Sequence, residues 1–366
     1  MKLTISQEKF SKALNNATRI ASSKNDLAVL NNILLRTDGN RLLIAATNLE
    51  MASKQYVGVK MDKPGSITVP ARLLSDFVSS LPGGAIELTV KDNLLSLKTD
   101  NFSSVINGVE ADEFPELPVV DEKQSVVCKF KSSQFKKSVS QTIVATSVDT
   151  SRPVLTGVFW HSKDGILLLA GTDGYRLAEK KTIKTKDDIS AIIPASTLQE
   201  VLRGIDDTEG EVKILFDDTQ VCFKYSDVEI ISKLIDGKFP DYQQLIPAKS
   251  ETEATLEKSD FSRITKIASL FARESGGGIT LTASKEKNNI SIHSIASELG
   301  ENDSEAEAKV TSDGQITLNS RYLVDALNAI DGDKVKIAFS GKLSPSVISQ
   351  DGDGSDYTHI IMPMKS

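Results

Sequence analysis

Apolar residues near the start of the chain recur every three or four positions and so predict an α-helix. The residues concerned are Phe10, Ala13, Leu14 and Ala17. Ser6 stands just ahead of them, where a hydroxyl can cap the first turn, and Ser132 and Ser259 stand similarly ahead of two related segments. The sequence therefore predicts one helix of this kind in each of three places.

Beyond this helix the apolar residues alternate or run together, which is typical of strands. In ILLRTDGNRLLIAAT the pair Asp38-Gly39 separates two such runs and predicts a hairpin turn. A second helix is predicted behind Pro70 by an apolar stripe at Leu74, Phe77, Val78 and Leu81. Each group of this kind predicts two helices laid on antiparallel sheet, which is an α+β unit.

The same landmarks return in the same order at intervals of about 125 residues, which indicates an internal repeat. AATNLEMA at 45–52 is echoed by AGTDGYRLA at 170–178. VPARLLSDFVSSL at 69–81 returns as IPASTLQEVLRGI at 193–205 and as LNSRYLVDALNAI at 318–330. We therefore predict three tandem copies of one α+β domain, at 1–120, 127–248 and 253–366.

Length and composition are those of ordinary globular domains. The 366 residues are 39% hydrophobic and 25% charged, and no stretch approaches the ~18 apolar residues that a membrane span needs. The start, MKLTISQEKF, has no apolar run of the signal-peptide kind, so we expect a cytoplasmic protein. Cys128 and Cys222 show no CxxC spacing, so we expect two small core residues rather than a disulfide or a zinc site.

Basic residues distinguish the three predicted first helices from the rest of the chain. The chain as a whole has a net charge of −7, yet these helices and their flanks carry an excess of Lys and Arg. A single helix with this excess would indicate only an ordinary solvent-exposed face. Three equivalent helices with the same bias favour a lining that holds a polyanion by its phosphates without reading bases. Aromatic residues are not interleaved with the lysines, so duplex nucleic acid is favoured over a single strand.

The residues that we expect to face the nucleic acid come from these helices, from the second helices and from the intervening loops. They are Lys9, Lys12, Arg19, Lys24, Arg72, Lys131, Lys136, Lys137, Arg152, Arg203, Lys258, Arg263, Lys266 and Arg321.

Nothing in the sequence indicates catalysis. His161, His293 and His359 are the only histidines, and none stands in a nucleophile or metal motif. A phosphate-cradling GxxxxGK[ST] is also missing from the sequence. We therefore expect no catalytic residue, no metal and no cofactor.

The triplicated domain, TDGYRLA, LIDGKFPDYQQLIP and the terminal MPMKS resemble the β subunit of bacterial DNA polymerase III, the sliding clamp. The resemblance covers the chain from end to end. It implies that three such domains form half a ring and that two chains close head to tail around duplex DNA. It also implies a processivity factor that tethers the replicative polymerase, with an ATP-dependent clamp loader to open the ring and other repair and replication proteins as further partners.

The resemblance further implies a groove between the second and third domains that binds a short linear peptide. Leu and Pro would supply an apolar slot, and unbranched Met adapts to different peptides. By position, the groove residues are Leu155, Thr172, Gly174, Tyr175, Arg176, Leu177, Pro240, Asn319, Tyr322, Leu343, Pro345, Met362, Pro363 and Met364.

The subunit interface of the family implies contacts of Leu270 and Phe271 with Ile106 and its neighbours from the partner's first domain. Three positions depart from the commonest family pattern: Tyr175 stands where His is frequent, Gly276 where a bulkier residue is usual, and Lys365-Ser366 where the end is basic-hydrophobic. These departures bear on which peptides are preferred.

A different class of function stays open at the level of the residues alone. The chain could be a multidomain protein-interaction scaffold that does not bind nucleic acid and whose lysines only keep its surface hydrated. Retention on nicked circular DNA, but not on the same DNA linearised, would distinguish the two, because only a closed ring slips off ends.

Overall fold

The computed structural model describes residues 1–21, 27–205, 209–273, 276–296, 300–352 and 355–364. Its contacts divide the chain into two compact units. One consists of Met1–Phe135 with Ser196–Leu234, and the other of Lys136–Ala195 with Ile235–Ser366. Helices α3 (Ser132–Ile143) and α4 (Ala195–Gly204) cross this division.

The first unit holds helices α1 (Gln7–Ile20) and α2 (Ala71–Ser80) and two sheets. The five-stranded sheet has the order β5-β1-β7-β8-β9. Its strands are β1 (Lys2–Ser6), β5 (Lys60–Lys63), β7 (Ala85–Lys91), β8 (Leu94–Lys98) and β9 (Ser103–Asn107). The eight-stranded sheet has the order β10-β15-β16-β17-β4-β3-β2-β6. Its strands are β2 (Asn32–Asp38), β3 (Arg41–Thr47), β4 (Met51–Gly58), β6 (Ser66–Pro70), β10 (Val126–Lys131), β15 (Glu211–Phe216), β16 (Gln220–Tyr225) and β17 (Val228–Lys233).

The second unit holds helices α5 (Lys258–Phe271) and α6 (Ser320–Ala329) and two further sheets. The nine-stranded sheet has the order β14-β11-β12-β13-β26-β25-β24-β18-β22. Its strands are β11 (Gly157–Lys163), β12 (Ile166–Thr172), β13 (Arg176–Lys184), β14 (Ser190–Pro194), β18 (Thr252–Glu257), β22 (Lys309–Val310), β24 (Lys334–Phe339), β25 (Ser346–Gln350) and β26 (Tyr357–Ile361). The four-stranded sheet, in the order β21-β20-β19-β23, contains β19 (Gly278–Ser284), β20 (Asn289–Ala296), β21 (Gly300–Glu307) and β23 (Gly314–Asn319).

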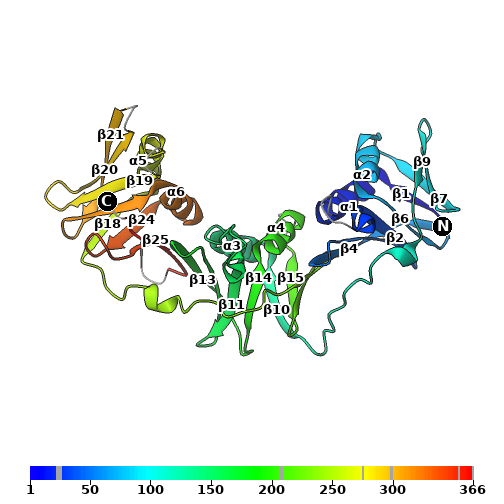
Figure 1. Ribbon diagram of the computed structural model, residues 1–366, viewed down its shortest axis with the longest axis horizontal. Coiled ribbons are helices and arrows are strands. Elements are labelled where there is room, and N and C mark those ends of the chain that lie inside the picture. The colour runs from blue at the N-terminus through cyan, green and yellow to red at the C-terminus, as the bar shows by residue number, and fades with distance from the viewer. Residues whose placement is uncertain (22–26, 206–208, 274–275, 297–299, 353–354, 365–366) are drawn as a thin grey trace. The chain divides into compact units, whose positions relative to one another are not determined.

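The same succession of elements occurs three times along the chain (Figure 1). Each copy has a strand, a helix, a group of strands, a second helix and three closing strands; the first copy adds β5 and the third adds β22. All the strand pairings are antiparallel, as for β17 with β4 and β13 with β26. The predicted fold class, three tandem copies of a two-helix α+β domain, is confirmed.

The large sheets run across the boundaries between copies. β17 of the second copy pairs with β4 of the first, from Val228 opposite Gln55 to Ser232 opposite Met51. β26 of the third copy pairs with β13 of the second, from Tyr357 opposite Lys180 to Ile361 opposite Arg176. Neighbouring copies are therefore joined by backbone hydrogen bonds as well as by side chains.

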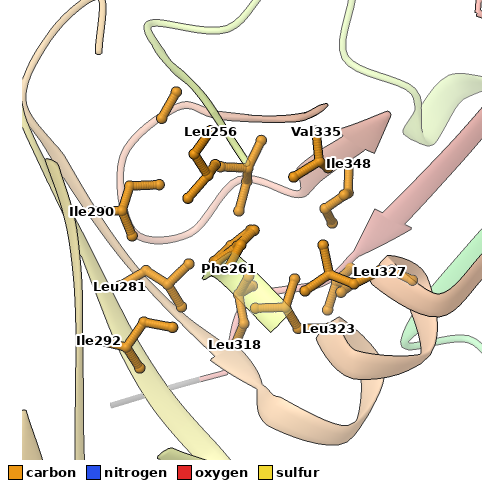
Figure 2. Close-up of a cluster of buried hydrophobic side chains, with 14 of the residues drawn as sticks. Leu256, Phe261, Leu281, Ile290, Ile292, Leu318, Leu323, Leu327, Val335 and Ile348 are labelled. Carbon is orange, nitrogen blue, oxygen red and sulfur yellow. The ribbon is translucent and has the colours of Figure 1, made fainter. Parts of the chain in front are cut away.

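Phenylalanines at equivalent places anchor the helices to the sheets. Phe10, Phe135 and Phe261 are each completely buried. Figure 2 shows Phe261 among Leu323 and Leu327 of α6 and apolar side chains from several strands. Burying such a side chain contributes roughly 1.5–3 kcal/mol to the free energy of folding, so the repeated phenylalanine holds each helix against its sheet.

The predicted helix starts are correct in position but not in every detail. Ser6 occupies the N-cap position of α1, yet its side chain makes no capping hydrogen bond to any residue that the structure describes. Ser132 and Ser259 lie inside their helices, since α3 begins at Ser132 and α5 at Lys258. Asn319, in contrast, caps α6: its Oδ1 accepts from the backbone N–H groups of Arg321 and Tyr322.

Both cysteines are buried, as expected for core residues. Burial raises the pKa of Cys222 to about 12, which keeps the thiol protonated and unreactive near neutral pH. In the described part of the chain, no helix has the length and apolar composition needed to cross a membrane.

Candidate functional site

The turn between β12 and β13 is held by the side chains of its own residues. Asp173 Oδ1 accepts from the backbone N–H groups of Tyr175 (2.8 Å) and Arg176 (3.0 Å). Thr172 Oγ1 donates to the carbonyl of Arg176 at 2.6 Å and accepts from Gly174 N. These bonds fix the turn and leave the Tyr175 ring exposed at its tip.

The equivalent turn between β3 and β4 has the same bonds. Asn48 Oδ1 accepts from the backbone N–H groups of Glu50 and Met51, and Thr47 Oγ1 donates to the carbonyl of Met51. Leu49 has φ +72° there, and Gly174 has φ +93°. Because positive φ costs a side-chain-bearing residue free energy, the second copy of the turn is the less strained. The repeated Ala-x-Thr-Asp/Asn sequence is thus explained by turn chemistry.

Arg176 is fixed in place by three groups. Its Nε donates to Asp173 Oδ2 at 3.1 Å and its Nη1 to Asp325 Oδ2 of α6 at 2.6 Å. The guanidinium lies over the Tyr322 ring, 4.4 Å from the centroid. Only 9% of the Arg176 side chain is exposed. Arg176 therefore joins the turn to α6 and holds the Tyr322 ring in a defined position.

The last described residues of the chain lie beside this turn. Met362 N donates to the carbonyl of Tyr175 at 2.9 Å, and Met364 N donates to the carbonyl of Thr317 in β23 at 2.8 Å. Met362, Pro363 and Met364 are half-buried. We use the name terminal patch for Thr172–Arg176, Tyr322 and Met362–Met364, which these contacts bring together.

The other predicted groove residues differ in exposure. Leu155 and Leu177 are buried, Asn319 and Pro345 are half-buried, and Pro240 is exposed. Leu343 is 80% exposed, and Pro345 adjoins the terminal segment because Ser346 pairs with Ile361. The predicted groove residues thus include buried members and exposed members that a partner can contact.

Several neighbours of the patch were not predicted from the sequence. Asp173 and Asp325 hold Arg176, and Arg152, predicted to face nucleic acid, lies against the turn: a Cβ added to Gly174 would stand 3.4 Å from its Nη1. The Asp173 turn bonds follow from the Thr-Asp-Gly sequence. The partnership with Asp325 spans 149 positions, so no local pattern could indicate it.

Gly276 lies close to the terminal patch, and its own geometry restricts what could replace it. It has φ +67°, and an added Cβ would meet Met364 Cε at 3.9 Å. A bulkier residue would therefore be strained in this backbone conformation. Ser366 and Lys365, the third departure from the family pattern, lie outside the described residues.

A buried histidine supports the strand that carries the terminal segment. Tyr357 Oη donates to the backbone carbonyl of Gln141 at 3.0 Å and lies 2.7 Å from Nδ1 of His359. Because Tyr357 donates its hydroxyl proton to the Gln141 carbonyl, the Tyr357 oxygen accepts from His359. The imidazole proton is therefore assigned to Nδ1. Nε2 of His359 then has no hydrogen-bond partner among the described residues. Burial, followed by the Arg176 charge, lowers the pKa of His359 to about 3.

This histidine predicts a loss of stability in mild acid. The unfolded chain protonates His359 below its ordinary pKa of about 6.5, whereas the folded chain does not until about pH 3. Stability is therefore complete above pH 6.5 and falls as the pH is lowered, by up to roughly tenfold in the folding constant per pH unit. Urea midpoints at pH 7.5 and 5.0 measure this loss. It should be smaller in His359→Asn than in the parent, and equal losses in the two proteins would contradict it.

Basic residues of the first unit are divided between solvent and ion pairs. Lys9, Lys12, Arg72 and Lys131 have exposed side chains. Arg19 Nε lies 2.8 Å from Glu200 Oε2, and Arg203 is bonded to the same carboxylate. Glu200 on α4 thus pairs with both arginines, and their contact with nucleic acid stays a prediction. Lys24 lies outside the described residues.

The second unit shows the same division. Lys266 and Arg321 are exposed and Lys136 is half-buried. Lys137 pairs with Asp331 at 2.8 Å, and Arg263 pairs with Asp260 at 3.0 Å. Lys258 donates to the carbonyl of Ile330. These partners do not remove the lysines from the surface, since exposed pairs of this kind are weak and can be exchanged for a phosphate.

The predicted interface residues lie at two places. Leu270 and Phe271 end α5; Leu270 is 55% exposed and Phe271 is half-buried. Ile106 lies in β9, the edge strand of its sheet, but only 4% of it is exposed. The sequence did not reveal that Val105, its 58%-exposed neighbour, is the side chain on the outer face.

No feature of the described residues resembles a catalytic centre. They contain no group of three or more His, Cys, Asp or Glu side chains arranged to hold a metal ion. His161 Nε2 lies 2.8 Å from Tyr242 Oη, and His293 Nδ1 lies 2.9 Å from Asp303 Oδ1. With His359 in the core, each histidine has a structural environment.

Comparison with known proteins covers the whole chain. Three family models of the DNA polymerase III β subunit match it in order: the N-terminal domain at residues 1–118, the central domain at 129–241 and the C-terminal domain at 243–365. The chain belongs to the sliding-clamp family. Clamps of this family are non-catalytic processivity factors of DNA replication that work with DNA and a polymerase, and the scaffold alternative is not favoured.

Individual clamps are similar over their full lengths. The β sliding clamps of Staphylococcus epidermidis and Staphylococcus aureus are each 30% identical to this chain, with complete coverage of both sequences. The crystal structure of the Bacillus subtilis clamp has a TM-score of 0.95 at 28% identity, covering 100% of this chain and 99% of the other. The Pseudomonas aeruginosa β subunit has a TM-score of 0.93 at 27% identity, with complete coverage of both chains.

The clamp domains have the order that the repeat predicts. The predicted limits, 1–120, 127–248 and 253–366, differ by several residues from the matched ranges. The two compact units do not test these limits, because the division between them falls within the second copy. The limits therefore stay predictions. The roles of the terminal patch, the basic residues and the α5 end also stay predictions for this clamp.

Proposed function

We propose that two copies of this chain, each forming half a ring, close head to tail around duplex DNA. The observation that carries the proposal is the pattern of free sheet edges. β9 ends the five-stranded sheet and β21 ends the four-stranded sheet. By position in the repeat, β9 corresponds to β17 and β26, and β21 corresponds to β4 and β13.

The corresponding strands are already paired with each other within the chain. β17 pairs with β4, and β26 pairs with β13, antiparallel in both cases. Pairing β9 of one copy with β21 of another would repeat the same junction a third time. Because an exposed edge has unpaired backbone N–H and C=O groups, this pairing satisfies the β9 edge and the β21 edge at once. Two chains would close a ring with all such edges paired.

Apolar side chains beside these edges support the same junction. Leu270 and Ile267 are exposed on α5, and Val105 and Phe102 are exposed at or near β9. An exposed cluster of this kind is unfavourable in water and is stabilised by burial against a partner. We propose that these residues, rather than the buried Ile106 alone, form the apolar part of the interface.

A direct test uses topology. The closed ring should remain on nicked circular DNA and be lost when the same DNA is cut once, after loading by an ATP-dependent clamp loader. Equal retention on both forms would contradict encirclement. The mass in solution, measured separately, should be that of two chains.

We propose that basic residues on α1, α3 and α5 hold the DNA phosphates. Changing Lys12, Lys136 and Lys266 to Glu should weaken DNA association, and the slope of log K against log salt should fall by about 1 for each lysine–phosphate pair that the change removes. The change should leave the dimer and the melting temperature close to those of the parent.

The matched control reverses three exposed lysines elsewhere, Lys60, Lys186 and Lys342. Both triple variants undergo the same change in net charge, so a general electrostatic effect would weaken them equally. The proposal requires the helix variant to be the weaker binder across the salt titration. Equal affinities of parent and helix variant at low salt would count against it.

We propose that the terminal patch binds short peptide motifs from the replicative polymerase, the clamp loader and other repair and replication proteins in the cytoplasm. Three features support it: Tyr175 is exposed, Met362 and Met364 are flexible apolar side chains, and Arg176 and Tyr322 are held rigidly beside the turn that carries Tyr175. Rigid groups beside adaptable ones suit a surface that several partners share.

A further inference from the structure

A pocket of about 580 Å³ lies on one face of the eight-stranded sheet, under residues 111–119. These residues belong to the connector that follows β9, the last strand of the first copy. We use the name connector pocket for it. Leu34, Leu43, Lys54 and Tyr56 line it from the sheet, and Phe114 and Leu117 line it from the connector. This volume lies within the range of about 300–1,000 Å³ that is usual for small-ligand sites.

The same face of the second copy shows which side chains occupy the equivalent position there. There the row Phe159–Ala170–Glu179 corresponds to Leu34–Ala45–Lys54, as the strand pairings show. The connector residue Tyr242 packs on this row with Phe239. Tyr242 Oη donates to Glu179 at 2.6 Å and lies 2.8 Å from His161 Nε2. The second copy therefore fills its face with its own aromatic ring, whose polar tip is bonded to a carboxylate.

The first copy lacks this ring and has the opposite charge. Leu117 stands where Tyr242 stands, Lys54 where Glu179 stands, and Arg36 where His161 stands. Leu117 is smaller than a tyrosine and cannot reach the polar row. The face that is closed in one copy is consequently open in the other.

Lys54 is the polar group that defines the pocket. It is only 8% exposed, and its ammonium donates to the carbonyl of Pro118 at 2.6 Å. Glu229 is opposite it across the strands, but that carboxylate lies 3.3 Å from Lys224 Nζ. Burial lowers the pKa of Lys54. A buried ammonium with a neutral acceptor is costly, so an added carboxylate would stabilise it.

The remaining charges of the connector pocket are at its rim. Arg36 is exposed, and so are Asp112 and Glu116 on the connector. Water and salt screen exposed charges far more than buried ones. The buried Lys54 therefore dominates the selection of a ligand, and the apolar lining selects its body.

We propose that the connector pocket binds an apolar monocarboxylate, in which an aromatic or aliphatic body lies against Tyr56, Leu117 and Val119 and the carboxylate meets Lys54. Such a group could be a free small acid or the last residue of a peptide. The terminal patch, in the second unit, is a separate site.

The test is a calorimetric titration of the full chain with N-acetyl-L-tryptophan, and with N-acetyl-L-tryptophanamide as the uncharged match. We expect saturable binding of the acid at one site per chain and at least tenfold weaker binding of the amide. Equal binding of the two compounds, or no binding of the acid at millimolar concentration, would overturn the proposal.

Two variants test the site itself. Lys54→Met keeps the length and the apolar stem of the side chain, and Leu117→Tyr supplies the ring that the second copy has. Both should weaken binding of the acid at least tenfold, whereas Lys60→Met, an exposed control, should bind as the parent does. Parent-like binding by Lys54→Met would overturn the proposal. Thermal melting checks that each variant is folded. If Lys54→Met does not fold, parent-like binding by Leu117→Tyr would overturn the proposal instead.

A final titration separates the two sources of the carboxylate. A pentapeptide Gly-Ser-Gly-Ser-Trp with a free end is compared with the same peptide amidated. Binding of the free-ended peptide at least as tight as that of the small acid supports a chain terminus as the ligand. Binding of the small acid alone supports a free metabolite-sized acid.

Discussion

Removing residues 362–366 is expected to weaken binding of a polymerase-derived peptide by about 100-fold and to abolish processive synthesis. The deletion removes Met362, Pro363 and Met364 from the terminal patch, where a few central apolar contacts are expected to carry most of the binding free energy. All three basic helices remain, so the truncated protein should still dimerise and encircle DNA. Titration of the peptide against both proteins measures the first effect, and primer extension measures the second.

The controls for this deletion separate docking from folding. Removing Lys365 and Ser366 alone leaves the apolar residues in place and should leave the affinity unchanged. The longer deletion also removes the backbone bonds from Met362 N to Tyr175 and from Met364 N to Thr317, so some decrease in melting temperature is expected. Met362→Ala with Met364→Ala keeps those bonds and should still reduce the affinity by most of the same factor. If the deletion and the double variant both bind as the parent does, the docking site lies elsewhere.

Replacing Leu270 and Phe271 by Ala is expected to convert the dimer to a folded monomer. Truncating two large apolar side chains in a packed interface costs about 2–4 kcal/mol each, and every 1.4 kcal/mol is tenfold in affinity. The dimer dissociation constant should therefore rise by about 1,000-fold or more. Sedimentation velocity over a range of protein concentrations gives this constant directly.

Leu73 provides a matched control for this variant. It lies on α2 and is 55% exposed, as Leu270 is, but it stands on the second helix of its copy rather than beside a free sheet edge. Leu73→Ala should leave the dimer unchanged. A double variant at Leu270 and Phe271 that keeps the parent's mass at nanomolar concentration would show that the α5 end is not part of the interface.

The sequence predicted the repeated fold well because each copy uses local patterns. The spacing of Phe10, Ala13 and Leu14 gives one buried face, and α1 buries all three residues. The pair Asp38-Gly39 predicts a hairpin turn, and β2 and β3 pair on either side of it, from Leu34 opposite Ala45 to Asp38 opposite Arg41. Because the helix patterns recur in all three copies, the interpretation did not depend on any single one.

The contacts between residues distant in the chain could not be predicted in this way. Arg19 and Glu200 are 181 positions apart, and Arg176 and Asp325 are 149 apart. Nothing near Arg19 shows that its charge is compensated from α4. The sequence therefore predicted which basic residues face nucleic acid without showing which of them are also held in ion pairs, and their contact with phosphate stays a prediction.

The ladders between β17 and β4 and between β26 and β13 have a consequence for work with fragments. A single copy expressed alone would have an edge strand without its partner. In the first copy this strand would be β4 (Met51–Gly58), and in the second it would be β13 (Arg176–Lys184), which has nine residues. Such strands are templates for further strand addition. Fragments of one copy should therefore aggregate or pair with each other, even though each copy has its own core and helices. Isotope labelling of one copy is better achieved by ligating segments of the intact chain than by expressing that copy alone.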